Sequence, residues 1–341
     1  MLKSAASFVF FTLPKRLPKN SLHLTNKTTI PGITLKQNRT MASSSNLDIG
    51  GIYPPIPTPF DEKENIAYDK LEKNLSIWNK APLKGYVVQG SNGEYTFLTA
   101  EERVEMVKKV REMIPKDKLI LAGSGCESTR DTIVMSEKMA EAGADAVLVV
   151  TPCYFKNAMT NAALINHYTK LADACPVPVI LYSVPANTGI DMAPEVVIQL
   201  SSHPNIIGLK DSGGDIGKIG NMVFKTKANN FQILAGSAGF LYPGYAVGCV
   251  GGVCALANVL PNEVCELDRL FKAGDHKAAQ DLQHRLIAPN AAITKKFGVP
   301  GLKASMERFG FYGGPPRSPL LPATPEDTEK LLGDFRYSGF L

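Results

Sequence analysis

Lys210 stands at the end of the apolar run 206–209 and is followed at once by Asp211, Ser212 and two glycines. Such a run predicts a buried parallel strand, and α/β enzymes place reactive groups at the carboxyl ends of these strands. The amine of a lysine can condense with a ketone to form a Schiff base when its surroundings keep it neutral. The plainer alternative is a lysine that leaves the sheet for solvent, so the groups at the other strand ends decide the interpretation.

Small neutral hydrogen-bonding groups and one phenol stand at the ends of the other apolar runs. They are Thr58, Gly90-Ser91-Asn92, Gly123-Ser124, Thr151, Tyr182-Ser183, Gly236-Ser237 and Asn258. These residues form neither a cluster of carboxylates and histidines for a metal nor a basic cluster for a phosphate. Neutral donors beside one lysine suit a small 2-oxo acid, because the donors can hold its carboxylate while the lysine attacks its ketone. No metal and no cofactor are therefore expected.

The elements that must position these residues alternate eight times along the chain. Apolar runs predict strands at 51–53, 85–89, 119–122, 146–150, 179–182, 206–210, 232–235 and 251–254. Amphipathic patterns predict helices at 67–79, 99–114, 128–142, 161–174, 193–202, 215–226, 239–248 and 262–273. Eight such units predict a (β/α)8 TIM barrel, since the glycine-rich turn that an open nucleotide-binding sheet needs after its first strand is missing.

Helix start signals support this division. Thr99 and Glu102 have the spacing of a capping box, and Asn262 is expected to cap a helix that Gly274 ends. After residue 275 the strand pattern stops, and the segments 276–297, 301–309 and 325–336 look helical. The sequence thus predicts a barrel at 48–275 and a C-terminal helical subdomain at 276–341.

Residues 1–47 differ in composition from the rest of the 341-residue chain. They hold seven lysines and arginines and no acid before Asp48, and they are rich in Ser and Thr, which is typical of a mitochondrial transit peptide. A secretory signal is the alternative, because Lys3 precedes the apolar stretch 5–13.

Beyond the leader, the chain holds 30 of its 37 basic residues and all 32 of its acidic residues. The resulting net charge of −2 does not favour binding to nucleic acid. No apolar run approaches the ~18 residues of a membrane span.

Three motifs resemble the dihydrodipicolinate synthase/N-acetylneuraminate lyase family of class I aldolases. They are Gly90-Ser91-Asn92-Gly93-Glu94, the segment 182–189 and the segment 208–212, and the resemblance extends over residues 49–340. Within this family, the segments 122–129, 234–240 and 251–258 are most similar to those of the mitochondrial members that cleave 4-hydroxy-2-oxoglutarate to pyruvate and glyoxylate. That location and activity are what the resemblance implies here.

The resemblance also implies roles for individual residues. Lys210 would form the Schiff base, Tyr182 would transfer protons, and Tyr154 would take part in catalysis, in its own site or in that of a neighbouring subunit. Ser91 and Asn92 would hold the substrate carboxylate, while Ser212 and Gly236 would line the pocket. Family members are commonly homotetramers built as dimers of dimers, and the same assembly is expected here.

Two departures separate the chain from the synthases of the family. Ser91-Asn92 replaces a pair of threonines, and Asn187 replaces an arginine that binds the amino-acid end of the synthase substrate. The alternatives are another pyruvate-forming 2-oxo acid lyase, such as a sugar-acid aldolase or a synthase-like enzyme, and a barrel that binds 2-oxo acids without catalysis.

Overall fold

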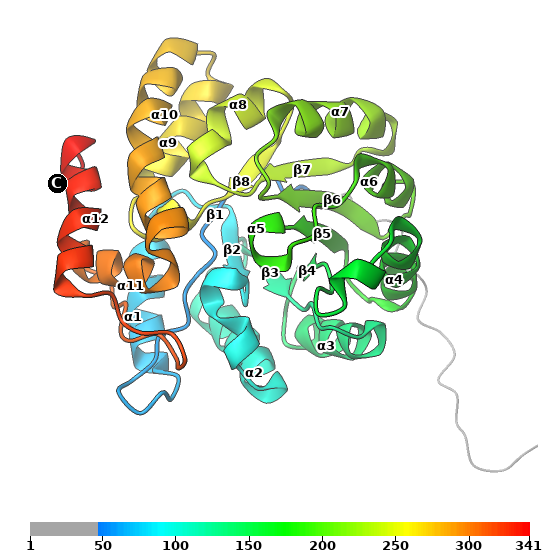
Figure 1. The fold of residues 1–341 in the computed structure, drawn as a ribbon, viewed down its shortest axis with the longest axis horizontal. Helices are drawn as coiled ribbons and strands as arrows, with labels where there is room; N and C mark the ends of the chain where they lie inside the picture. The colour runs from blue at the N-terminus through cyan, green and yellow to red at the C-terminus, as the bar shows by residue number, and fades with distance from the viewer. Residues whose placement is uncertain (1–46) are drawn as a thin grey trace, which may run out of the picture. The chain divides into compact units, whose positions relative to one another are not determined.

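The computed structural model describes residues 47–341, and the predicted leader lies outside them except for Leu47. The strands are β1 (Gly51–Tyr53), β2 (Gly85–Val88), β3 (Leu119–Gly123), β4 (Ala146–Val150), β5 (Val179–Ser183), β6 (Ile206–Asp211), β7 (Gln232–Ala235) and β8 (Gly251–Val253). Paired strands are parallel, in the order β1-β8-β7-β6-β5-β4-β3-β2. Helices surround them (Figure 1), which confirms the predicted TIM barrel.

The residues that follow β1 bridge the gap between β1 and β2. The backbone N–H of Val87 donates to Pro54 at 3.0 Å, and the N–H of Ile56 donates to the carbonyl of Val87 at 3.0 Å. The N–H of Lys84 donates to Ile52 at 3.0 Å. Because the last gap is bridged in this way, the carboxyl ends of all eight strands meet on one rim.

The helices that alternate with the strands lie within two residues of the predicted bounds, apart from the short α5. They are α1 (Tyr68–Trp78), α2 (Ala100–Met113), α3 (Thr129–Glu141), α4 (Asn161–Ala174), α5 (Pro185–Thr188), α6 (Pro194–Leu200), α7 (Ile216–Thr226), α8 (Leu241–Ala246) and α9 (Pro261–Lys272). The capping box of Thr99 and Glu102 is confirmed. The predicted cap at Asn262 is wrong, because Pro261 already occupies the first helical position and Asn262 lies inside α9.

Buried apolar side chains form one core inside the barrel and another between the strands and the helices. β5 supplies both, since Ile180 and Tyr182 point inward while Val179 and Leu181 point to the helices. This alternation is expected of a strand that is buried on both faces. The interior core consists of Ile49, Tyr53, Val87, Leu121, Ala146, Leu148, Ile180, Tyr182, Val184, Leu234 and Val253.

A register shift at the start of β6 decides the direction of Lys210. Two residues of β6, Ile206 and Ile207, stand opposite the single residue Val179 of β5. Beyond this bulge Leu209 packs between the strands and the helices, so the next side chain, Lys210, faces the barrel interior.

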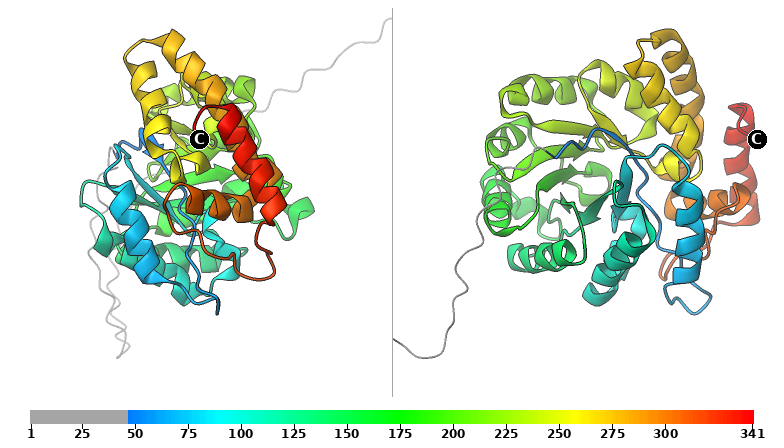
Figure 2. Two further views of the ribbon diagram at one scale, coloured as in Figure 1. Left: turned by 90° about the vertical axis from the view of Figure 1, so that its left-hand side faces the viewer. Right: turned by 180° about the vertical axis from the view of Figure 1, so that it is seen from behind.

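Three helices continue the chain beyond the barrel: α10 (His276–Ala291), α11 (Gly298–Arg308) and α12 (Pro325–Tyr337), with the π-helix Ala292–Lys296 after α10. They stand beside α1 and α9, with α12 outermost (Figures 1 and 2). On α10, Gln283 donates to the carbonyl of Ala238 at 2.8 Å and Asn290 donates to the hydroxyl of Ser237 at 2.9 Å. The C-terminal helices therefore contact the loop after β7, and the domain boundary at residue 275 stays a prediction.

Among residues 47–341, no helix combines the length and the apolar character that a membrane span requires.

The stability of the barrel should depend on pH through His167 on α4. His167 is 4% exposed, its Nδ1 lies 2.9 Å from the hydroxyl of Thr129, and burial lowers the pKa of His167 to about 4. The unfolded chain binds this proton below about pH 6.5 and the folded chain only below about pH 4, so stability falls as the pH decreases between these values. We expect a loss of about 2 kcal/mol from pH 7.5 to pH 5. The free energy of unfolding, measured with urea, should therefore decrease less in His167→Gln than in the wild type between pH 7.5 and pH 5. An equal decrease in both proteins would contradict this role of His167.

Candidate active site

Lys210 and Tyr182 lie side by side in the barrel interior, near the ends of β6 and β5. They pair directly across the two strands, and Lys210 Nζ is 3.8 Å from the centre of the Tyr182 ring. Lys210 is 4% exposed and Tyr182 is 5% exposed. The alternative of a lysine that leaves the sheet for solvent is therefore wrong.

The phenol of Tyr182 lies among groups that stabilise its ionised form. Burial works to raise the pKa of Tyr182, but the positive charge of Lys210 and hydrogen bonding by Ser91, Lys210 and Ser212 outweigh it, so the pKa is lower than that of a free tyrosine. The hydroxyl groups of Ser91 and Tyr182 are 3.3 Å apart. The arrangement can supply a phenolate base next to an amine.

The turn after β2 places Ser91 at this phenol. Gln89 adopts a left-handed backbone (φ 63°), and Ser91–Gly93 forms a short 3₁₀ helix. The hydroxyl of Thr58 donates to the carbonyl of Gly93 at 2.6 Å and holds the turn against the loop after β1. Asn92 lies half-buried in the same turn.

A small pocket opens at this turn. It is lined by Gln89, Gly90, Ser91, Tyr95, Gly123, Gly125, Leu148, Val150 and Tyr182. Of the predicted site residues, Ser91 and Tyr182 form its walls, and Lys210 lies against the Tyr182 ring. The polar groups of this pocket come mainly from the turn after β2 and from the two phenols of Tyr95 and Tyr182.

Ser212 and Gly236 meet where β6 and β7 end. The Ser212 hydroxyl donates to the carbonyl of Gly236 at 3.4 Å, and the N–H of Gly236 donates to the backbone carbonyl of Asp211 at 2.7 Å. A Cβ atom at position 236 would lie 2.1 Å from Ser212 Oγ, so only glycine permits this approach. Hydrogen bonding by Ser212 contributes to the lowered pKa of Tyr182, so Ser212 lies near this phenol with Gly236 beside it, and their role in a pocket stays a prediction.

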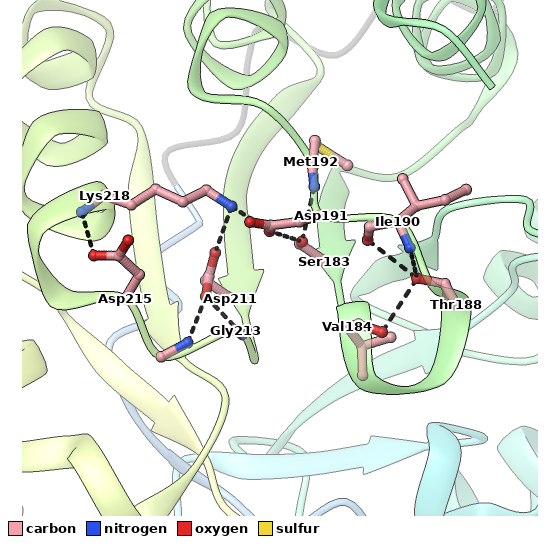
Figure 3. A network of polar contacts seen from close by, with 11 residues as sticks. Ser183, Val184, Thr188, Ile190, Asp191, Met192, Asp211, Gly213, Asp215 and Lys218 are labelled. Atoms are coloured by element: carbon pink, nitrogen blue, oxygen red, sulfur yellow. Dashed lines mark hydrogen bonds and ion pairs between the residues drawn. The ribbon is translucent and has the colours of Figure 1, made fainter. Parts of the chain in front are cut away.

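A polar network holds the outer faces of the same two strand ends (Figure 3). Asp211 accepts from the N–H groups of Gly213 at 2.8 Å and Gly214 at 3.2 Å. Lys218 Nζ lies 3.7 Å from the Asp211 carboxylate and also pairs with Asp191. Burial raises the pKa of Asp211, an effect that Lys218 and the two amides oppose.

The network reaches β5 through Ser183, whose hydroxyl donates to Asp191 at 3.4 Å and accepts from Met192 N–H at 3.3 Å. Ser183 directly follows Tyr182 in β5, and Asp211 directly follows Lys210 in β6. The strand ends that carry Tyr182 and Lys210 are thus tied to each other, to α7 and to the loop after β5.

Tyr154 lies apart from this group. Its side chain is 78% exposed and stacks edge-on against Phe155, with the ring centres 5.0 Å apart. The loop that carries it is fixed by Glu127, which accepts from the N–H of Tyr154 at 2.9 Å. Within residues 47–341 the predicted role of Tyr154 at its own site therefore gains no support, and a role in a neighbouring subunit stays a prediction.

Several other rim residues serve the loops rather than a ligand. Asn258 donates to the carbonyls of Pro55 and Ala255, at 3.0 Å each. Ser124 accepts from Ser136 at 2.8 Å. Together with Thr58, these residues have structural partners, so the number of free donors at the rim is smaller than the sequence suggested.

Sequence reasoning missed Tyr95 and Arg103. Tyr95 lines the cavity, and burial raises its pKa to about 12. Arg103 is buried on α2 and donates to the carbonyls of Gly123 at 2.8 Å and Gly125 at 3.1 Å, which fixes the loop after β3. A signal was present, because Arg103 shares the apolar face of its helix with residues three, four and seven positions further on.

No group of three or more His, Cys, Asp or Glu side chains suitable for a metal occurs in the part of the chain that the structure describes.

Comparison with known proteins gives the site its context. Residues 48–335 match the model of the dihydrodipicolinate synthetase family. A probable mitochondrial 4-hydroxy-2-oxoglutarate aldolase of Emericella nidulans is 33% identical over 295 residues, which cover 85% of this chain and 95% of that protein. A dihydrodipicolinate synthase from Bacillus anthracis has a similar structure, with a TM-score of 0.81 and 32% identity over 85% of this chain and 98% of its own.

The synthase of Acinetobacter baumannii, solved with pyruvate, has a TM-score of 0.81 at 27% identity, covering 86% of this chain and 99% of its own. The family match and the structural similarity both extend over nearly all the described residues. The chain therefore belongs to the dihydrodipicolinate synthetase family of lyases.

Proposed function

We propose that this protein is a class I aldolase that cleaves 4-hydroxy-2-oxoglutarate reversibly to pyruvate and glyoxylate. The observation that carries the proposal is the contact between the buried amine of Lys210 and the ring of Tyr182, a phenol whose pKa is lowered. The ammonium group of Lys210 can pass a proton to the phenolate of Tyr182, which frees the amine for attack on a ketone.

The cleavage begins when neutral Lys210 attacks C2 of the substrate. Tyr182 returns its proton to the C2 hydroxyl group, whose loss as water gives a protonated imine, and the phenolate of Tyr182 then takes the proton of the C4 hydroxyl group. The C3–C4 bond breaks, its electron pair moves into the imine to form an enamine, and glyoxylate leaves. Protonation of the enamine at C3 and hydrolysis of the imine then release pyruvate and regenerate Lys210. No step uses a metal, because the imine accepts the electron pair.

The remaining predicted residues have roles in binding. Ser91 and Asn92 would hold the carboxylate next to the ketone, while Ser212 and Gly236 would close the side of the pocket formed by β6 and β7. Binding of pyruvate by the Acinetobacter relative supports a site for a 2-oxo acid.

Asn187 supports an aldolase over a synthase. It lies exposed on α5, where the synthases of the family carry an arginine. An asparagine cannot replace a charge-assisted contact with the amino-acid end of aspartate semialdehyde, which is worth about 1.5–3 kcal/mol. The rival synthase reading rests on relatives such as the Bacillus anthracis enzyme, which are as similar as the aldolase.

One assay separates these functions. The purified chain is incubated with 4-hydroxy-2-oxoglutarate in EDTA, and glyoxylate and pyruvate are measured as they form. We expect equal amounts of both products, and no condensation of pyruvate with aspartate semialdehyde. A faster reaction with aspartate semialdehyde or with a sugar acid would contradict the substrate assignment, and no reaction with any of them would favour a binding barrel without catalysis.

The assembly and the location of the protein are part of the same proposal. A homotetramer built from two dimers would give the exposed rings of Tyr154 and Phe155 a partner surface. The composition of residues 1–47 supports import into the mitochondrial matrix.

A further inference from the structure

Glu94, the last residue of the Gly-Ser-Asn-Gly-Glu motif, is buried although it carries a charge. Its side chain is 1% exposed and pairs with Lys303 of α11, whose Nζ lies 2.7 Å from Glu94 Oε1. The other carboxylate oxygen accepts from the backbone N–H of Arg317 at 2.9 Å. The side chain of Glu94 therefore does not cap a local turn, because both of its partners come from the C-terminal part of the chain.

Lys303 has three polar partners at this point. Besides Glu94, it donates to the carbonyl of Thr58 at 2.9 Å and to the carbonyl of Pro315 at 2.8 Å. Its side chain is 1% exposed, and its Nζ lies 4.5 Å from the centre of the Phe60 ring. Burial lowers the pKa of Lys303, an effect that the charge of Glu94 opposes.

The pair thus joins the loop after β1, the turn after β2 and the C-terminal segment. Thr58 contacts both sides of this junction, because its carbonyl accepts from Lys303 and its hydroxyl donates to the carbonyl of Gly93. The turn begins and ends on residues with left-handed backbones, Gln89 (φ 63°) and Glu94 (φ 55°), which non-glycine residues adopt only when their surroundings hold them. A turn of this kind needs an anchor, and the ion pair is attached at its last residue.

We propose that the buried Glu94–Lys303 pair positions the Ser91-Asn92 turn, so that the C-terminal helices set the affinity of the site for the carboxylate of a 2-oxo acid. The inference rests on the proposed function in that it takes this turn as the carboxylate-binding element. It makes Glu94 and Lys303 positioning residues, since neither lines the cavity next to Ser91 and Tyr182.

The test compares Glu94→Gln with Glu102→Gln. Glu102 is a matched control, because it also pairs with the C-terminal segment, through Arg317 at 2.8 Å, but stands at the start of α2 beyond the turn. Both substitutions remove one charge, and glutamine can keep the capping box of Glu102 and the contact of Glu94 with Arg317 N–H.

Two readouts are used on the full chain. Hydrogen exchange of the peptide 85–98 reports the turn, whose Gly93 and Glu94 N–H groups donate to Gly90 and Ser91. Trapping with borohydride at increasing pyruvate concentrations reports the affinity for a 2-oxo acid. For Glu94→Gln we expect exchange of these amides to become about tenfold faster. The half-saturating pyruvate concentration should rise about tenfold, while the rate of trapping at saturating pyruvate should change much less. Glu102→Gln should change the melting temperature but neither readout.

Glu94→Gln leaves the ammonium group of Lys303 buried without a counter-charge, which can prevent folding. The double variant Glu94→Gln/Lys303→Met removes this charge and should recover most of the melting temperature, yet keep the fast exchange and the weak binding of pyruvate. If the variants lose stability while exchange of the turn and half-saturation stay normal, the pair has only a structural role and the proposal is overturned. If the wild-type chain cannot be trapped, the Schiff-base function fails, and exchange of the turn alone still decides whether the pair positions it.

Discussion

Replacement of Lys210 by alanine should abolish both cleavage and the trapping of pyruvate by borohydride. The amine is the group that forms the imine, and no other step of the proposed reaction can proceed without the imine. We expect turnover to fall by at least about 10⁴-fold, the scale on which the loss of a covalent nucleophile is felt. Alanine removes a buried ammonium group that lies against an aromatic ring, so the barrel should remain folded.

Mass spectrometry of the trapped wild-type chain provides the check. Reduction of the imine should add the mass of one reduced pyruvate unit to the peptide that contains Lys210. Lys218 is the informative comparison, since it lies near the same strand end and is largely buried by its pairing with two aspartates. Trapping on Lys218, or trapping that persists in Lys210→Ala, would contradict the assignment.

Most of the barrel could be predicted from the sequence because its strands are short apolar runs with clear ends. The direction of Lys210 could not be predicted in the same way. Every residue of the run 206–209 is apolar, so no alternation marks the inward face, and the bulge at Ile206 and Ile207 changes that face within the strand. Only the pairing with β5 reveals the shift.

The central residues of the site were predictable for a related reason. Tyr182 and Lys210 stand at equivalent positions on neighbouring parallel strands, and parallel pairing brings such positions together. The contacts of Glu94 were not predictable, because they come from α11 and from Arg317, 223 positions away in the sequence. A local pattern carries no information on a partner at that distance, and the glutamate of a turn is ordinarily a solvated residue.

Tyr154 marks a further limit. Its sequence position relative to β4 places it near the rim, but its side chain is largely exposed to solvent. Whether that ring meets a neighbouring subunit depends on a surface that one chain cannot supply.

Replacement of Tyr182 by phenylalanine should slow cleavage by about 10²–10⁴-fold, the range for the loss of a positioned proton-transfer group. The ring remains in place against Lys210, so the substitution removes only the hydroxyl group and folding should be preserved. Trapping of pyruvate should slow as well, because formation of the imine also requires proton transfer. A Tyr182→Phe enzyme that cleaves at a near-normal rate would contradict the role of the phenol.

Tyr53→Phe is the matched control. Tyr53 is the interior tyrosine of β1, and its hydroxyl has no hydrogen-bond partner among residues 47–341. Burial raises the pKa of Tyr53 far above its ordinary value, so this phenol cannot act as a base near neutral pH. We expect Tyr53→Phe to cleave at the wild-type rate.

The pH dependence of the two variants separates a base from a packing residue. Because Lys210, Ser91 and Ser212 lower the pKa of Tyr182 against the effect of burial, the rate should rise with pH as its phenol ionises, and this rise should lie below the pH at which a free tyrosine ionises. Tyr53→Phe should keep the rise, and Tyr182→Phe should lack it. If Tyr182→Phe keeps the rise while its rate falls, the phenol only packs against Lys210 and another group takes the proton of the C4 hydroxyl.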